Sequence, residues 1–247
     1  MPTQTPLTDA INALTTYANT VTSASDTTLS DAVATLAAGY GGGGGSEPTL
    51  PTGYTRMLCL VSSGTQYIDT GLYTKANQEY YIQFRCGSGG QNIFGNNLAT
   101  GCGCYIQVNN TTIYYRFGLA NYITSSNTPF RDDGLNLLRD FKCNIDGLWW
   151  ADERPTGYTL VNPITGSTVT EDSTIHNILF GRTTGTNARQ LSTVKIYHFK
   201  CVEGGTTVRD MYPAKRDSDS VLGMYDVANN VFYTNNGSGT FTAEAMA

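Results

Sequence analysis

Pairs of adjacent aromatic residues are the feature of this sequence best suited to binding a ligand. Trp149-Trp150 and Tyr114-Tyr115 both lie in segments that alternate apolar and polar residues, as strands do. Because neighbouring strand residues point to opposite faces, one ring of each pair should enter the core and the other should lie on an outer face. An exposed ring is a flat apolar surface that can stack on the C–H face of a sugar. Burial at a subunit contact is the alternative, and the sequence leaves both open.

Polar residues near these pairs could complete a ligand site. Asp152 and Arg154 follow the tryptophans, and Arg182 and Asn187 lie in a loop rich in threonine. Charged side chains at such positions can make paired hydrogen bonds with a ligand, or they can belong to solvated loops. The predicted ligand-binding residues are Trp149, Trp150, Tyr114, Tyr115, Asp152, Arg154, Arg182 and Asn187.

Catalytic patterns are not recognisable in the sequence. His176 and His198 each lie in a predicted strand, and His176 has no acidic partner at a telling spacing. There is no Gly-x-Ser-x-Gly, phosphate loop or His-Glu-x-x-His. Glycoside hydrolysis needs two carboxylates across a cleft. The acidic candidates for that role are Glu79, Asp132, Asp133, Asp152, Glu153 and Glu171, and nothing pairs them. We therefore expect a protein that is not an enzyme, with a polysaccharide-degrading enzyme as an alternative.

Metal ligands are equally hard to find. The spacing of Cys102 and Cys104 is too short for a structural zinc site, and Cys59, Cys143 and Cys201 alternate with apolar residues, as small core residues do. Asp132 and Asp133 are adjacent and could contribute oxygen ligands to calcium. They match no defined calcium motif, so the sequence predicts no cofactor and leaves calcium as an open alternative.

The charge balance limits the kinds of partner. The 247 residues carry a formal net charge of −5, and 15 Lys and Arg residues form no cluster. Nucleic acids and anionic membranes bind clustered cations, so neither is an expected partner. No apolar stretch is long enough to span a bilayer, and no signal peptide is apparent at the N-terminus. Synthesis in a cytoplasm is the expectation.

Three regions follow one another along the chain. Residues 1–40 predict two short helices and residues 41–50 predict a flexible linker built on five consecutive glycines, while residues 51–247 form the third region. Short helices are marginal alone, so their apolar faces need a partner in sister subunits, in another protein or in each other. The residues of these predicted anchoring and oligomerisation faces are Leu7, Ile11, Leu14, Val21, Leu29, Val33 and Leu36.

The region 51–247 predicts an all-β domain. Short alternating segments such as 79–84, 105–108, 112–117 and 193–200 are separated by turn residues, and no long helical stripe occurs. Asp146-Gly147 and Gly204-Gly205 are typical of hairpin turns. Regular short strands of this kind indicate an antiparallel β-sandwich.

Two separated segments carry a family resemblance. One is Ser63-Gly64-Thr65-Gln66-Tyr67-Ile68-Asp69-Thr70-Gly71, and the other runs from Cys201 to Phe241 through Val208-Arg209-Asp210-Met211-Tyr212-Pro213. Together they resemble the two ends of a laminin-G-like (concanavalin A-like) jelly-roll domain, of the variety attached to phage and prophage virion proteins. The resemblance covers roughly residues 54–242 and implies a structural role for the C-terminal segment.

The resemblance also implies a biological setting. It suggests a virion structural protein, displayed on the virion surface as a short fibre or decoration and held to other virion proteins by the N-terminal helices. We expect a homo-oligomer, with a trimer as the favoured state, that adheres weakly and in many copies to a cell-surface glycan. A purely structural protein that stabilises the particle without binding glycan is the alternative.

Overall fold

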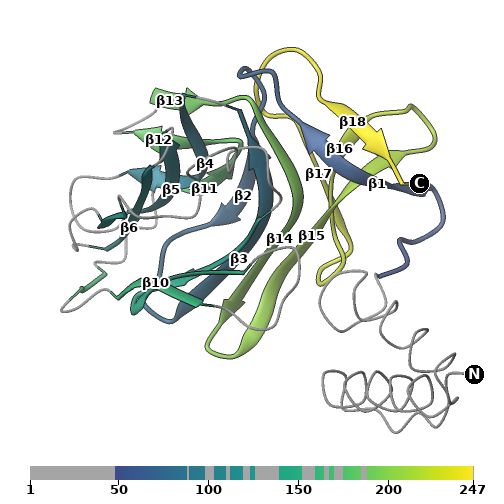
Figure 1. The fold of residues 1–247 in the computed structure, drawn as a ribbon. Coiled ribbons are helices and arrows are strands. Elements are labelled where there is room, and N and C mark those ends of the chain that lie inside the picture. Colours follow the sequence, from purple (N-terminus) through teal and green to yellow (C-terminus); the bar gives the residue numbers. More distant parts are fainter. Residues whose placement is uncertain are drawn as a thin grey trace, which may run out of the picture. The chain divides into compact units, whose positions relative to one another are not determined.

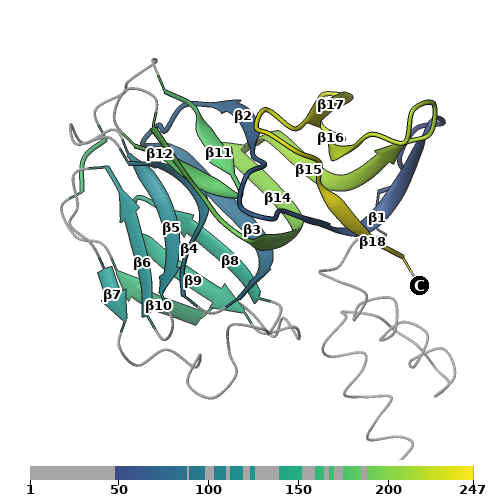
Figure 2. The ribbon, with the colours of Figure 1, turned by 90° about the horizontal axis from the view of Figure 1, so that it is seen from above.

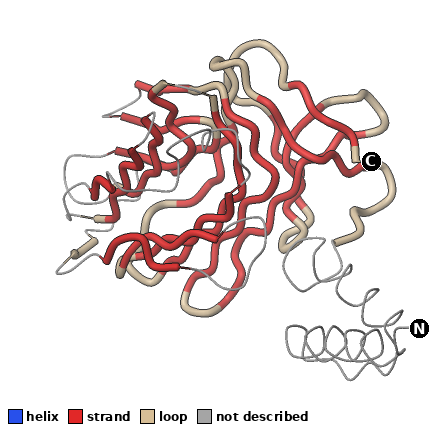
Figure 3. Tube along the Cα trace, in the orientation of Figure 1, coloured by secondary structure: helices blue, strands red, loops and turns tan. Residues whose placement is uncertain are grey.

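Alternating apolar and polar segments form strands throughout the described part of the chain. The computed structural model describes residues 48–87, 89–97, 103–109, 112–118, 123–125, 139–151, 159–163, 167–169, 175–184 and 188–246. These residues contain strands and loops and no helix (Figure 3). Accordingly, none of them belongs to a helix long and apolar enough to cross a membrane. The predicted helices, with Leu7 to Leu36, and residues 41–47 of the predicted linker lie outside the described residues.

The strands form two sheets, here named sheet A and sheet B. Sheet A contains ten strands: β1 (Tyr54–Val61), β3 (Gln78–Cys86), β8 (Arg139–Asn144), β9 (Gly147–Ala151), β10 (Thr159–Pro163), β14 (Val194–Glu203), β15 (Thr206–Arg216), β16 (Leu222–Asp226), β17 (Val231–Thr234) and β18 (Thr242–Ala245). Sheet B contains eight: β2 (Ile68–Leu72), β4 (Gly90–Asn97), β5 (Cys104–Asn109), β6 (Thr112–Phe117), β7 (Ile123–Ser125), β11 (Asn177–Leu179), β12 (Gly181–Thr184) and β13 (Ala188–Leu191).

The two sheets pack face to face as a β-sandwich, which confirms the predicted fold class at that level (Figure 1). The strand order of sheet A is β10-β9-β8-β3-β14-β1-β15-β16-β17, with β18 beside β1. The strand order of sheet B is β13-β12-β4-β5-β6-β7, with β11 beside β4 and β2 beside β11. Seen from above, β16 to β18 and the adjoining parts of β1 and β15 lie beyond the edge of the sandwich (Figure 2). We call these strands the C-terminal lobe.

One strand pair departs from the predicted antiparallel arrangement. β11 runs antiparallel to β4, but β12 runs parallel to it, with Thr183 opposite Asn96. The reversal occurs at Phe180, whose φ of 67° is unusual for a residue with a side chain. The Phe180 amide donates to the Ile93 carbonyl at 3.0 Å, and its buried ring lies 4.8 Å from that of Phe241. These contacts stabilise the sharp turn that sets β12 parallel to β4.

The core lies between the sheets and follows from strict alternation. In β3 every second residue, from Gln78 to Cys86, is buried, which is the pattern of a strand with one face on a core. Tyr80 of β3 packs on Phe94 of β4 with ring centroids 4.8 Å apart, and Phe199 of β14 lies 5.1 Å from Phe94. Aromatic rings from both sheets thus interdigitate, and the intervening residues of β3 are left on the outer face of sheet A.

The two segments that carry the family resemblance meet in the structure. The Asn236 amide donates to the Tyr67 carbonyl at 2.9 Å, and the Ser238 amide donates to the Thr65 carbonyl at 3.0 Å. Arg209 Nε donates to the Thr70 carbonyl at 3.1 Å. Backbone groups about 170 residues apart in sequence therefore satisfy each other.

Gly237 is the tightest point of this contact. A Cβ atom on Gly237 would lie 2.2 Å from the Thr65 carbonyl oxygen, which is closer than real Cβ atoms approach. We therefore expect Gly237→Ala to lower the free energy of unfolding by roughly 2 kcal/mol or more. Gly87→Ala is the matched control, because nothing lies within 4 Å of the added atom. Urea unfolding of both variants measures the difference, and equal stability would show that the contact yields easily.

Candidate functional site

One outward row of side chains crosses four strands of sheet A at the level of Trp149. Trp149 on β9 pairs with Lys142 on β8, and Lys142 pairs with Tyr81 on β3. Tyr81 in turn pairs with Lys200 on β14. Directly opposed residues of neighbouring strands have Cβ atoms about 5 Å apart. Aromatic and cationic side chains therefore alternate along the row.

The lysines of this row contact the aromatic rings. Lys142 Nζ lies 5.3 Å from the centre of the Trp149 ring and 5.7 Å from that of Tyr81. Lys200 Nζ lies 5.9 Å from the Tyr81 ring on the next strand. Ammonium groups are attracted to aromatic faces at such distances, so the row is ordered by its own contacts.

Glu79 adds an acceptor beside the row. Lys142 Nζ lies 2.8 Å from Glu79 Oε2, and the Tyr81 hydroxyl donates to Glu79 Oε1. Burial alone would raise the pKa of Glu79, but the hydrogen bonds from Lys142 and Tyr81 outweigh it and hold the pKa below its ordinary value. The carboxylate is therefore ionised and fixed in place.

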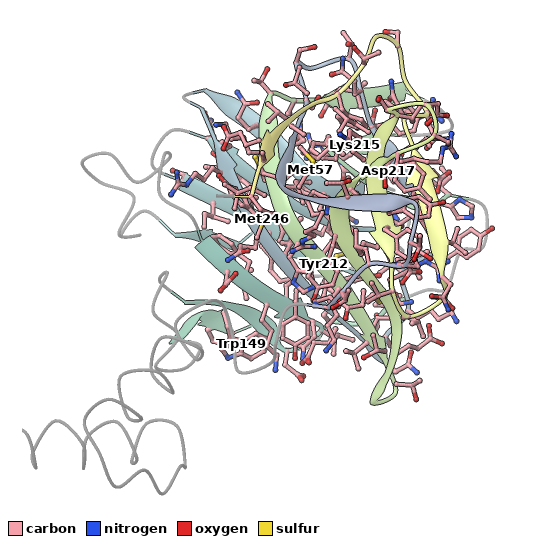
Figure 4. The ribbon with its side chains drawn as sticks, turned by 90° about the vertical axis from the view of Figure 1, so that its right-hand side faces the viewer. Met57, Trp149, Tyr212, Lys215, Asp217 and Met246 are labelled. Carbon is pink, nitrogen blue, oxygen red and sulfur yellow. The ribbon has the colours of Figure 1, made fainter. Side chains whose placement is uncertain are left out.

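A second outward row lies next to the first and centres on His198. Asp140 pairs with Gln83 and Gln83 pairs with His198. His198 Nε2 lies 2.7 Å from Asp210 Oδ1, and its ring stacks on Tyr212 with centroids 4.4 Å apart. Figure 4 looks at this side of the molecule and labels Trp149 and Tyr212.

Trp149 is the ring of this face best placed to meet a ligand. The Tyr212 ring already contacts both His198 and Arg56, whose Cζ atom lies 4.1 Å from the ring centre. Tyr81 has a lysine from each neighbouring strand against it. Trp149 is half-buried, and among the described residues Lys142 is its only cationic or ring contact.

Asp140 is the group of this face with the most strongly altered acidity. Burial raises the pKa of Asp140 from its ordinary 3.8 to about 6, although His198 and a hydrogen bond from Gln83 act in the opposite direction. A carboxyl group with such a pKa changes its protonation state close to neutral pH. It can therefore act as a hydrogen-bond donor or acceptor according to pH.

The face as a whole combines donors, acceptors and one accessible ring. Lys142, Lys200 and Gln83 supply N–H donors, and Glu79 and Asp140 supply acceptor oxygens. A sugar presents hydroxyl groups that both donate and accept, together with apolar C–H faces. This mixture of side chains is chemically suited to such a ligand, and the strands that carry it are long and paired on both sides.

The aromatic residues predicted to bind ligand lie in different parts of the fold. Trp149 lies on the outer face of sheet A, and the side chain of Trp150 lies outside the described residues, although its backbone pairs with Phe141. Tyr114 lies half-buried on the outer face of sheet B. Tyr115 is a correction to the prediction: it is fully buried in the core, where its hydroxyl donates to the Asn144 carbonyl.

Of the remaining predicted residues, the structure describes Arg182 alone. Arg182 is half-buried on β12 of sheet B, and the sandwich separates it from Trp149. Asp152, Arg154 and Asn187 lie outside the described residues, as do the calcium candidates Asp132 and Asp133. The described residues contain no cluster of three or more metal-ligating side chains.

Both histidines have acidic partners that the sequence did not indicate. His176 Nδ1 lies 2.8 Å from Asp69 Oδ1, more than a hundred residues away in sequence. His198 meets Asp210 across the β14–β15 hairpin, whose turn at Gly204-Gly205 was predicted. That hairpin was the one available signal, because its register brings His198 towards β15.

The prediction that Cys59, Cys143 and Cys201 are core residues is confirmed. Cys59, Cys86, Cys104, Cys143 and Cys201 are buried and free. Burial raises the pKa of Cys59 to about 11 and that of Cys86 to about 12. Cys59 and Cys86 are therefore neutral thiols at physiological pH.

Comparisons with known proteins identify no family for this chain. No protein-family model matches the chain, and no curated protein matches it. Among solved structures, the chain is similar to a candidate carbohydrate-binding protein from Bacteroides ovatus ATCC 8483, at 11% sequence identity and a TM-score of 0.46. The match covers 77% of this chain and 60% of the other.

The raised pKa of Asp140 predicts that the free energy of unfolding depends on pH. Because its pKa is higher in the folded protein (about 6, from 3.8), the folded state holds its proton more tightly, and stability falls as pH rises through that interval. We expect Asp140→Asn to raise the free energy of unfolding by about 1–3 kcal/mol near pH 7.5. The gain should vanish near about pH 3.5, where both states are protonated. Thermal unfolding across this pH range provides the measurement, and a gain that does not depend on pH would contradict the explanation.

Proposed function

We propose that the chain is an adhesin whose sandwich binds a cell-surface glycan through the outer face of sheet A. The observation that carries the proposal is the half-buried Trp149, which lies in a row with Lys142, Tyr81 and Lys200. A sugar ring can stack on the indole while its hydroxyls bond to the ordered lysines and to Glu79. The side chains are fixed by cation–π contacts and ion pairs, so little entropy is lost when a ligand binds.

The biological setting is part of the same proposal. We propose a laminin-G-like jelly roll displayed on the surface of a phage virion, as a short fibre or decoration. The hydrogen bonds between the segments around Tyr67 and Asn236 support the resemblance on which this rests. The N-terminal residues would join the domain to other virion proteins and to sister subunits, with a trimer as the favoured state. Many copies would then turn weak contacts into stable adhesion.

A glycan-array screen with the full chain tests the proposal. Wild type should bind at least one neutral glycan, and Trp149→Ala should weaken that binding about tenfold, or about 1.4 kcal/mol. Tyr73→Ala is the matched control. Tyr73 is also half-buried, its ring centroid lies 4.4 Å from that of His176, and it directly follows β2 of sheet B. Circular dichroism checks that both variants fold.

The outcomes separate adhesion from a purely structural role. Equal losses in the two variants would contradict a site at Trp149. No binding by the wild type, even when multimerised for avidity, would favour a protein that stabilises the particle and contacts no glycan.

Glycoside hydrolysis is a second candidate, and Asp140 is the observation that favours it. A carboxyl group with a pKa of about 6 suits a general acid, and Asp140 lies near the His198–Asp210 pair. Glycans that bind on the array should then release fragments with a newly formed reducing end during incubation, and Asp140→Asn should stop that release without abolishing binding. Bound glycans that stay intact would leave adhesion as the function.

A further inference from the structure

A row of side chains on the outer face of sheet B carries two arginines. Arg182 on β12 pairs with Gln190 on β13, and the residue that follows it, Thr183, pairs with Asn96 on β4 next to Gly95. Gly95 pairs with Tyr105 on β5, and Tyr105 pairs with Arg116 on β6. The row therefore holds a guanidinium group on each side of Tyr105.

Close packing around Gly95 and a cation–π contact mark the neighbourhood of Tyr105. A Cβ atom on Gly95 would lie 1.9 Å from the Cys104 carbonyl oxygen, so the position cannot hold a side chain. The Arg182 guanidinium lies over the Tyr105 ring, with Cζ 4.5 Å from the ring centre. Tyr105 is fully buried, and stacking on an aromatic face orients a guanidinium group.

Both guanidinium groups are held by neutral acceptors. Arg182 Nε donates to Gln190 Oε1 at 2.8 Å. Arg116 Nε donates to the Gly118 carbonyl at 3.0 Å, and its Nη1 donates to Asn97 Oδ1 at 2.9 Å. Within the described part of the chain, no carboxylate lies against either group, and the remaining N–H donors of each fork stay available.

The surroundings of these arginines lack negative charge. Asp69 on β2 is the sole acidic residue in the eight strands of sheet B, and its partner is His176. By contrast, Nη2 of Arg216 in the C-terminal lobe lies 2.7 Å from Asp219 Oδ2. In a chain with a net charge of −5, two oriented cations without a carboxylate on them form an unusual feature.

We infer that the outer face of sheet B at Arg116 and Arg182 is a second binding site, which takes the carboxylate of an acidic sugar. A guanidinium fork matches a carboxylate through paired N–H···O bonds, and both forks are already oriented by Tyr105, Gln190 and Asn97. A nucleic acid is disfavoured, because two arginines on an acidic protein cannot neutralise a polyphosphate. This site lies beyond the glycan face of sheet A, and neither proposal depends on the other.

Titration of the full chain with sugar acids tests the site. The ligands are glucuronate, galacturonate and N-acetylneuraminate, each compared with its methyl ester, and binding is followed by the Arg Nε–H signals in NMR. At least one acid should bind tenfold or more tightly than its ester, because the ester has lost the charge. Arg116→Gln and Arg182→Gln should each weaken that binding by about tenfold to a hundredfold.

Two further variants make the result specific. Arg189→Gln removes the same charge from β13, but Arg189 pairs with the buried Thr183 and lies over Tyr67, so it should bind as wild type does. Arg182→Lys keeps the charge and loses the fork, and it should bind more weakly than wild type. Thermal unfolding confirms that each variant is folded.

Several results would overturn the inference. Among them are the absence of binding by all three acids, equal binding of acid and ester, and unchanged binding in the Arg116 and Arg182 variants. Inorganic sulfate that binds as tightly as the best sugar acid would show a site for a bare anion and would reject the sugar as its ligand. All of these leave binding at Trp149 on sheet A untouched, so the two proposals fail separately.

Discussion

The pairing of β1 with strands from the far end of the chain is the constraint on which both outer faces depend. Leu60 of β1 lies opposite Ile196 of β14, and Arg56 lies opposite Ala214 of β15. The segment of β1 from Met57 to Val61 also pairs with β18. These contacts close loops of more than a hundred residues, so their entropic cost must be met by many contacts formed together. Once β1 is fixed, β14 is held on both sides and its outward residues acquire defined neighbours.

A buried polar network ties the two sheets together at one end of the sandwich. Asn96 of β4 donates to Asn177 of β11, Asn177 donates to the Tyr80 hydroxyl of β3, and Tyr80 donates to Gln78. Gln78 in turn donates to Glu203 of β14 at 3.0 Å. Loss of one partner would leave the next polar group buried and unpaired, at about 1–3 kcal/mol. The network therefore favours one register of the sheets over others.

Local pattern was sufficient to predict strands, turns and the direction in which side chains point. Alternation in 79–84 predicted β3, and Gly204-Gly205 predicted the turn of the β14–β15 hairpin. The same rule placed one tryptophan outward, where Trp149 is found. It could not indicate that Lys142 and Lys200 lie on either side of Tyr81, because these lysines are 61 and 119 residues away in sequence and become neighbours of Tyr81 only when the sheet forms. Tyr115 was misjudged since alternation cannot tell which ring of a pair is buried.

The two outer faces differ in how their charges are satisfied, and this difference follows from strand composition. On sheet A, Lys142 lies against Glu79 and His198 against Asp210, so much of the charge is paired within the face. On sheet B, Arg116 and Arg182 are oriented by amides, a carbonyl and a ring. A charged ligand gains little binding free energy on a face whose charges are already paired, because an ion pair must first break. Such a face is better suited to a neutral ligand. A face whose cations are ordered but not paired with carboxylates gains the full charge-assisted bond.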